Sequence, residues 1–89
     1  MSDLTMKHNT EANRYEAWDG DALAGLAEYQ LTDQLIVLTH TEVDPSYEGK
    51  GVGSQVARFA LDDVRAAGKK VDPVCPYVAS WIDKHPDYA

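Results

Sequence analysis

The sequence is poor in cysteine, in long apolar runs and in cationic side chains. Its single cysteine, Cys75, excludes a disulfide bond within the chain, so nothing in the sequence favours a secreted protein. The longest aliphatic run covers only residues 35–38, whereas a membrane-spanning helix needs about 18 apolar residues. The first residues show neither the basic region nor the apolar stretch of a signal peptide. We therefore expect a cytoplasmic protein with no membrane partner.

The shortage of cations limits the possible partners further. Lysine and arginine together number 8 against 15 aspartates and glutamates, which gives a net charge of −7 and a pI near 4.6. This balance argues against nucleic acid as a partner. The charge is uneven, however, because residues 49–71 hold five cationic side chains and only two carboxylates. Two interpretations stay open for this stretch: a solvated helix face, or a local binding site for an anion.

The chain of 89 residues, 44% hydrophobic and 26% charged, has the composition of one globular domain over residues 1–89. The pattern predicts strands at residues 5–8, 14–18, 23–31, 35–43 and 70–74, and helices at 51–67 and 77–84. Asp19 and Gly20 suit the tight turn of a hairpin. The last strand follows a helical crossover, so a parallel pairing with residues 35–43 is expected. The predicted fold is α/β in the mixed sense: an antiparallel β-meander, one βαβ unit and a short C-terminal helix.

Strict alternation makes a further prediction for the strand at residues 23–31. It places Gly25, Ala27 and Tyr29 on one face of the sheet, and Ala24 and Leu26 on the other.

The stretch with the most chemical content follows the strand at residues 35–43. Gly49, Gly51 and Gly53 lie where that strand passes into the predicted helix. A helix N-terminus exposes unpaired N–H groups and a partial positive charge, and glycine lets the backbone approach a ligand closely. Lys50 adds a full positive charge. The loop therefore predicts a phosphate site, although the dinucleotide-binding and nucleoside-triphosphate glycine motifs both fail to match it.

This loop resembles motif A of the GNAT superfamily of N-acetyltransferases, Q/R-x-x-G-x-G/A at the start of a helix. Residues 48–53 match that pattern, with Glu48 where the pattern has Gln or Arg. The resemblance extends over about residues 10–88, and the ordered set looks like the small stand-alone GNAT-like group. It rests on His40-Thr41-Glu42-Val43, the glycine loop, Cys75-Pro76-Tyr77-Val78, Trp81 and His85-Pro86.

The resemblance implies acetyl-coenzyme A as the cofactor. Backbone groups of the loop would hold the pyrophosphate, and the end of the preceding strand would hold the pantetheine arm. The residues so implicated are Thr41, Val43, Glu48, Gly49, Lys50, Gly51, Val52, Gly53 and Ser54.

His40 and Glu42 are candidate catalytic residues, because they lie two apart on one strand and share a face. Either could remove a proton from an attacking amine. Otherwise His40 is a hydrogen-bonded, half-buried side chain and Glu42 a solvated one.

Cys75 is the third catalytic candidate, since Pro76 suits the first position of a helix and a thiol there can have a lowered pKa. The predicted topology places Cys75 near His40. The thiol could protonate the leaving thiolate or accept the acetyl group itself; alternatively it is a small buried apolar residue.

The predicted activity is transfer of acetyl from acetyl-coenzyme A to a small-molecule or lysine-type amine by direct attack. The alternative is a non-catalytic module that binds coenzyme A, because larger GNAT enzymes carry two acceptor-covering helices for which this chain has no room before Arg14. No metal site is expected, since the histidines and Cys75 lack the close spacing of metal ligands.

Overall fold

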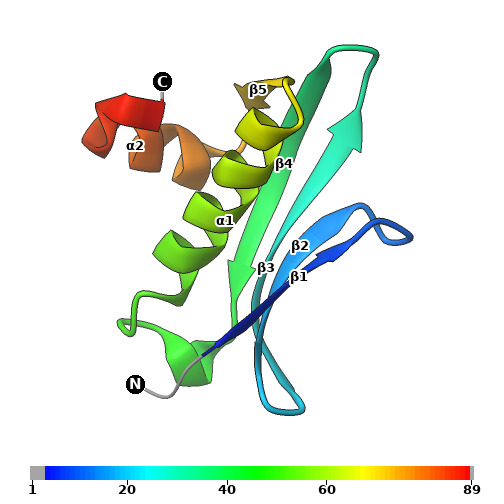
Figure 1. Ribbon diagram of the computed structural model, residues 1–89. Helices are drawn as coiled ribbons and strands as arrows, with labels where there is room; N and C mark the ends of the chain where they lie inside the picture. Colours follow the sequence, from blue (N-terminus) through cyan, green and yellow to red (C-terminus); the bar gives the residue numbers. More distant parts are fainter. Residues whose placement is uncertain (1–3, 89) are drawn as a thin grey trace.

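The computed structural model describes residues 4–88, which form one five-stranded sheet and two α-helices (Figure 1). The strands are β1 (Thr5–Asn9), β2 (Arg14–Asp19), β3 (Ala22–Leu31), β4 (Leu35–Val43) and β5 (Lys70–Pro73). The helices are α1 (Val52–Ala66) and α2 (Pro76–Lys84), with short 3₁₀ turns at Pro45–Tyr47 and Pro86–Tyr88. The strand order is β1-β2-β3-β4-β5, with antiparallel pairs throughout except for the parallel pair of β4 and β5. The predicted mixed α/β fold is confirmed.

Helix α1 has apolar residues at helical spacing and is closed at both ends by glycine. Gly51 precedes it in the left-handed conformation at φ 79°, and Gly68 follows it at φ 72°. The amides of Gly68 and Lys69 donate to the carbonyls of Arg65 and Val64, which is the Schellman arrangement that satisfies the last carbonyls of a helix. The helix therefore ends at Ala66, within one residue of its predicted limit.

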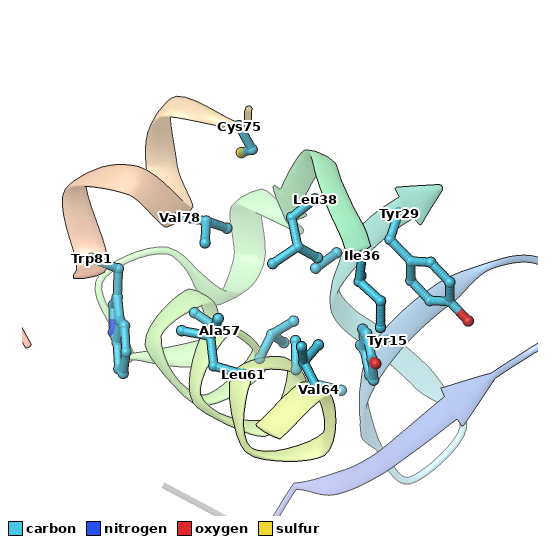
Figure 2. Close-up of a cluster of buried hydrophobic side chains, with 14 of the residues drawn as sticks. Tyr15, Tyr29, Ile36, Leu38, Ala57, Leu61, Val64, Cys75, Val78 and Trp81 are labelled. Atoms are coloured by element: carbon cyan, nitrogen blue, oxygen red, sulfur yellow. The ribbon is translucent and has the colours of Figure 1, made fainter. Parts of the chain in front are cut away.

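One face of the sheet carries the core (Figure 2). Leu38 of β4, Val56 of α1 and Val78 of α2 are fully buried there, and Trp81 of α2 is 5% exposed. Both helices lie on this same side of the sheet (Figure 1). Burial of apolar surface at roughly 25 cal/mol per Å² is thus concentrated in a single layer between the helices and the sheet.

Two irregularities in the sheet shift its alternation. Between the pairs Ala17↔Gly25 and Trp18↔Leu23, Ala24 has no partner on β2. Ala24 is fully buried in the helix-side core together with Ala27, so the prediction from strict alternation that it faces the other way is wrong. A β-bulge adds one residue to a strand and so reverses the face to which the side chains beyond it point. A pattern of strict alternation cannot predict this change.

The second irregularity lies in β4, where Glu28 pairs with His40 but Tyr29 pairs with Leu38. Thr39 is therefore left without a partner on β3. The bulge bends β4 at the point where its pairing with β5 ends. The candidate site described below lies along β4 beyond this bend.

The opposite face of the sheet has no helix packed on it among residues 4–88. Glu16 of β2 lies on this face and is nevertheless 3% exposed, because its neighbours cover it. Burial alone would raise the pKa of the Glu16 carboxyl, but hydrogen bonds from Trp18, Arg14 and Asn9 outweigh burial and lower it. The buried carboxylate is thus kept ionised by its three donors.

Candidate functional site

The glycine loop forms the turn between β4 and α1. Gly49 and Gly51 both have a left-handed backbone conformation, at φ 78° and 79°, which residues other than glycine rarely adopt. The loop needs these two residues to reverse the chain from the end of β4 into the helix. The prediction that residues 49–53 lead directly into a helix is confirmed.

The start of α1 presents donors for an anion. The amides of Val52, Gly53 and Ser54 lie in the first turn, where no helix carbonyl is available to them. The amides of Glu48 and Lys50, in contrast, donate to the carbonyls of Pro45 and Tyr47. The first helical turn therefore offers donors to the predicted phosphate site, whereas the amides of Glu48 and Lys50 are engaged within the loop.

A groove of about 510 Å³ lies beside these donors. Its lining comprises Thr41, Val43, Tyr47, Glu48, Gly49, Gly51, Val52, Gly53 and Tyr77. Seven of these residues were named from the sequence as cofactor-binding candidates. Tyr77 of α2 closes one side, and its hydroxyl group lies so near Gly53 that an added Cβ there would stand 2.5 Å from it.

The groove continues along an unaccompanied edge of β4. Strand β5 pairs with β4 only from Leu35↔Lys70 to Leu38↔Pro73. The Cys75 amide then donates to the Leu38 carbonyl at 2.8 Å, after which the chain turns into α2. From Thr39 to Val43, β4 thus has backbone groups that face away from β3 with no neighbouring strand among the described residues, as an extended ligand requires.

Cys75 lies at the inner end of this edge, where α2 begins (Figure 2). The thiol is buried, with Sγ 3.4 Å from Thr41 Oγ1. Burial alone would raise the pKa of Cys75, but hydrogen bonds with the Thr41 hydroxyl and with the amides of Val78, Tyr77 and Thr41 lower it overall. The Thr41 hydroxyl and the start of α2 together therefore favour the thiolate form of Cys75.

His40 and Glu42 form a contact on the helix-free face of the sheet. The distance from His40 Nε2 to Glu42 Oε1 is 3.1 Å, and their side chains are 49% and 65% exposed. Their predicted common face is confirmed. Thr41, which lies between them, points to the helix side and contacts Cys75. Cys75 and His40 therefore lie toward opposite faces of β4.

The side chains of two predicted cofactor residues, Ser54 and Lys50, contact aromatic residues of the protein. The Ser54 hydroxyl accepts a hydrogen bond from Trp81 Nε1 at 2.8 Å, so its side chain joins α1 to α2 while its amide stays available. Lys50 Nζ lies 5.8 Å from the centre of the Tyr47 ring.

Sequence reasoning missed Tyr47. Tyr47 lines the groove, and its hydroxyl donates to Asp19 Oδ2 at the end of β2 at 2.8 Å. No motif pointed to this residue, because its role depends on a contact between segments 28 residues apart.

Among residues 4–88, no three histidine, cysteine, aspartate or glutamate side chains gather as metal ligands would. In the same part of the chain, neither α1 nor α2 has the length and apolar character needed to span a membrane.

Comparison with curated proteins finds relatives named Protein NATD1. The chain is 34% identical over 59 residues to the proteins of Gallus gallus and Homo sapiens. The aligned region covers 65% of this chain and 54% and 52% of those proteins, respectively. The chain thus spans about half the length of the curated relatives it matches.

Comparison with solved structures finds acetyltransferase folds. A GCN5-like putative N-acetyltransferase from Staphylococcus aureus aligns over 99% of this chain and 86% of its own, with a TM-score of 0.74 and 23% identity. A Bacillus subtilis acetyltransferase solved in complex with CoA aligns over 84% of this chain and 54% of its own, with a TM-score of 0.63 and 26% identity. A family model described as GCN5-related N-acetyltransferase matches residues 14–89. The chain therefore belongs to the GCN5-related N-acetyltransferase family.

Proposed function

We propose that this protein transfers the acetyl group of acetyl-coenzyme A to an amine. The observation that carries the proposal is one continuous site. It runs from the free amides at the start of α1, through the groove, along the unaccompanied edge of β4 to the Cys75 thiol. A phosphate site joined to an extended backbone edge suits a long ligand with an anionic head and an amide-bearing arm. The Bacillus subtilis relative supports this proposal through its bound CoA.

The residues present fit such a cofactor. The amides of Val52, Gly53 and Ser54 would donate to its phosphate oxygens, and Lys50 would add charge. Backbone groups of β4 from Thr41 to Val43 would pair with its pantetheine arm. Acetyl-coenzyme A supplies an acyl group already activated as a thioester. Glu48, which also lines the groove, would oppose the phosphates electrostatically.

The helix-free face of the sheet is proposed as the side from which the amine enters. His40 and Glu42 lie there, beside the gap that opens where β5 leaves β4. His40 would accept the proton that the amine releases, and Glu42 would orient the imidazole through their 3.1 Å contact. The charge outside residues 49–71, three cations against thirteen anions, favours a cationic small-molecule or lysine-type amine.

Cys75 is proposed to act from the helix side of the same gap. In direct transfer, the bond from the amine nitrogen to the acetyl carbon forms and the carbon–sulfur bond breaks. The Cys75 thiol, held at 3.4 Å from Thr41, would donate the proton that the departing thiolate takes up. The second route open to Cys75 is to accept the acetyl group itself, with the amine attacking afterwards.

Calorimetric titration with coenzyme A tests the cofactor half of the proposal. We expect saturable binding that Gly53→Glu abolishes, because the new carboxylate stands among the free amides. Lys50→Glu, at an exposed position, should weaken binding without a packing change. Ser80→Glu is the matched control, since it adds the same charge on the exposed side of α2.

Three outcomes would count against this cofactor site. Gly53→Glu could bind like the wild type, ADP could compete as well as coenzyme A does, or Ser80→Glu could weaken binding equally. Circular dichroism should show that each variant keeps the helix content of the wild type.

A further inference from the structure

A second pocket lies at the opposite end of α1 from the glycine loop. It has a volume of about 490 Å³ and is lined by Leu61, Val64, Arg65, Gly68, Lys69, Lys70, Val71 and Tyr88; we call it the α1 C-terminal pocket. Because α1 has 15 residues, its two ends are about 22 Å apart. Figure 1 shows the end of α1, the start of β5 and the C-terminal segment together, away from the glycine loop. The pocket is thus separate from the groove proposed for the cofactor.

The lining of the α1 C-terminal pocket combines an apolar floor with a cationic rim. Leu61 and Val64 are 4% and 3% exposed and form the floor. Arg65, Lys69 and Lys70 are three of the eight cations of the chain. Within residues 4–88, none of the three lies within 4.0 Å of a carboxylate oxygen. Positive charge is therefore concentrated at this pocket in a protein whose net charge is −7.

Arg65 is held in position before any ligand arrives. Its guanidinium carbon lies 4.8 Å from the centre of the Tyr88 ring, and one terminal nitrogen donates to the Asp87 carbonyl. A fixed planar guanidinium loses little side-chain entropy when its remaining N–H groups bind an anion. Burial and the neighbouring Asp62 carboxylate raise the pKa of the Tyr88 hydroxyl.

The cations are not needed to cap the helix. The carbonyls of Asp63, Val64 and Arg65 already accept hydrogen bonds from the amides of Ala67, Lys69 and Gly68. The negative end of α1 is therefore satisfied by backbone donors. The charges of Lys69 and Lys70 stay available to a ligand.

We propose that the α1 C-terminal pocket binds a small organic anion, a phosphate or carboxylate attached to a flat apolar ring. The floor and the Tyr88 ring would contact the apolar part, and Arg65, Lys69 and Lys70 would hold the anionic group. The volume of about 490 Å³ lies within the range of small-molecule sites. This site is independent of the acetyl-transfer proposal, since it shares no residue with the groove.

Titrations followed by amide NMR shifts test the proposal, with phenyl phosphate and phenylacetate as probes. We expect saturable shifts at Gly68, Val71 and Tyr88, with a dissociation constant of about 1 mM for the better probe. Inorganic phosphate, which has only the charge, and benzyl alcohol, which has only the ring, should each bind at least tenfold more weakly. The ratio of the two probes tells phosphate from carboxylate as the preferred anion.

The double substitution Lys69→Gln, Lys70→Gln should weaken binding about tenfold, and Tyr88→Ala should do the same by removing the ring and the support of Arg65. Lys84→Gln, which removes an exposed cation of α2 outside the pocket, should leave binding unchanged. The proposal is overturned if the shifts do not saturate, if they appear only at residues 51–54, or if Lys84→Gln weakens binding as much as the double substitution.

Discussion

Replacement of Gly53 by alanine should separate ligand binding from stability. An added Cβ at this position would stand 2.5 Å from the Tyr77 hydroxyl oxygen and 2.8 Å from Cζ. Ordinary contact needs about 3.5 Å, so the ring must retreat by about 1 Å. Tyr77 is 43% exposed and the nearest atom is the far end of its side chain, so it can move without disturbing the core. The displaced ring and the new methyl group would both crowd the free amides of the first turn.

The expected result is weaker coenzyme A binding with nearly unchanged folding. Gly53 has an ordinary helical backbone, which alanine can adopt without strain. Alanine lowers the conformational entropy of the unfolded chain and so stabilises the fold by about 0.4–1 kcal/mol, which offsets the cost of displacing Tyr77. Binding should weaken about tenfold, which corresponds to about 1.4 kcal/mol. Calorimetry measures the affinity, and urea unfolding followed by circular dichroism measures the stability.

Gly68→Ala is the reciprocal control. Gly68 has φ 72° and no atom within 4 Å of an added Cβ, so alanine meets no clash but takes a left-handed backbone that costs about 1–2 kcal/mol. This variant should lose stability and keep its affinity for coenzyme A. The reasoning is refuted if Gly53→Ala binds like the wild type, or if Gly68→Ala loses affinity in proportion to its lost stability.

Three further predictions concern charge. Glu48→Gln should tighten coenzyme A binding two- to fivefold by removing a carboxylate from the groove, with the gain shrinking at high salt; equal affinity at low salt would place Glu48 away from the phosphates. The Cys75 thiol should titrate below the ordinary thiol pKa of about 8.5, as followed by ultraviolet thiolate absorbance, and Thr41→Val should raise the midpoint. Because folding lowers the pKa of Cys75, ionisation of this thiol adds to the free energy of unfolding. That contribution is complete above the thiol pKa of the unfolded chain and is lost as the pH falls through the thiol pKa of the folded protein. A titration midpoint that is not shifted would contradict the contacts of Cys75 with Thr41 and α2. Transfer to cationic amines should slow as ionic strength rises past about 0.1 M, where the screening length is about 10 Å, and equal rates for acidic and basic amines at low salt would exclude steering by the acidic surface.

The sequence predicted the elements of the fold well because their patterns are local. The apolar spacing of α1 and the hairpin signal at Asp19 and Gly20 depend on neighbours within a few residues, and the helix and the hairpin are both present. The turn itself is one residue later than predicted, because Asp19 ends β2 and pairs with Ala22. The bulges at Ala24 and Thr39 were missed, because an extra residue in one strand depends on the pairing with the next.

The sequence predicted which residues make up the candidate site, but not which face of the sheet each catalytic candidate lies on. The glycine loop and the groove follow from a contiguous stretch of sequence, as does the contact between His40 and Glu42. The placement of Cys75 and His40 toward opposite faces of β4 does not follow in this way, because it depends on where β5 leaves β4. The α1 C-terminal pocket likewise brings Tyr88 beside Arg65 across 22 residues, a contact that no local pattern encodes.

The central claim is acetyl transfer at the gap between β4 and β5. Release of free coenzyme A thiol from acetyl-coenzyme A, measured with and without a cationic amine, tests it most directly. We expect release to depend on the amine, and we expect the His40→Ala, Cys75→Ala double variant to lose it while still binding coenzyme A. Tight binding without amine-dependent release would contradict the claim and make the protein a binding module, and a fully active double variant would place the chemistry elsewhere.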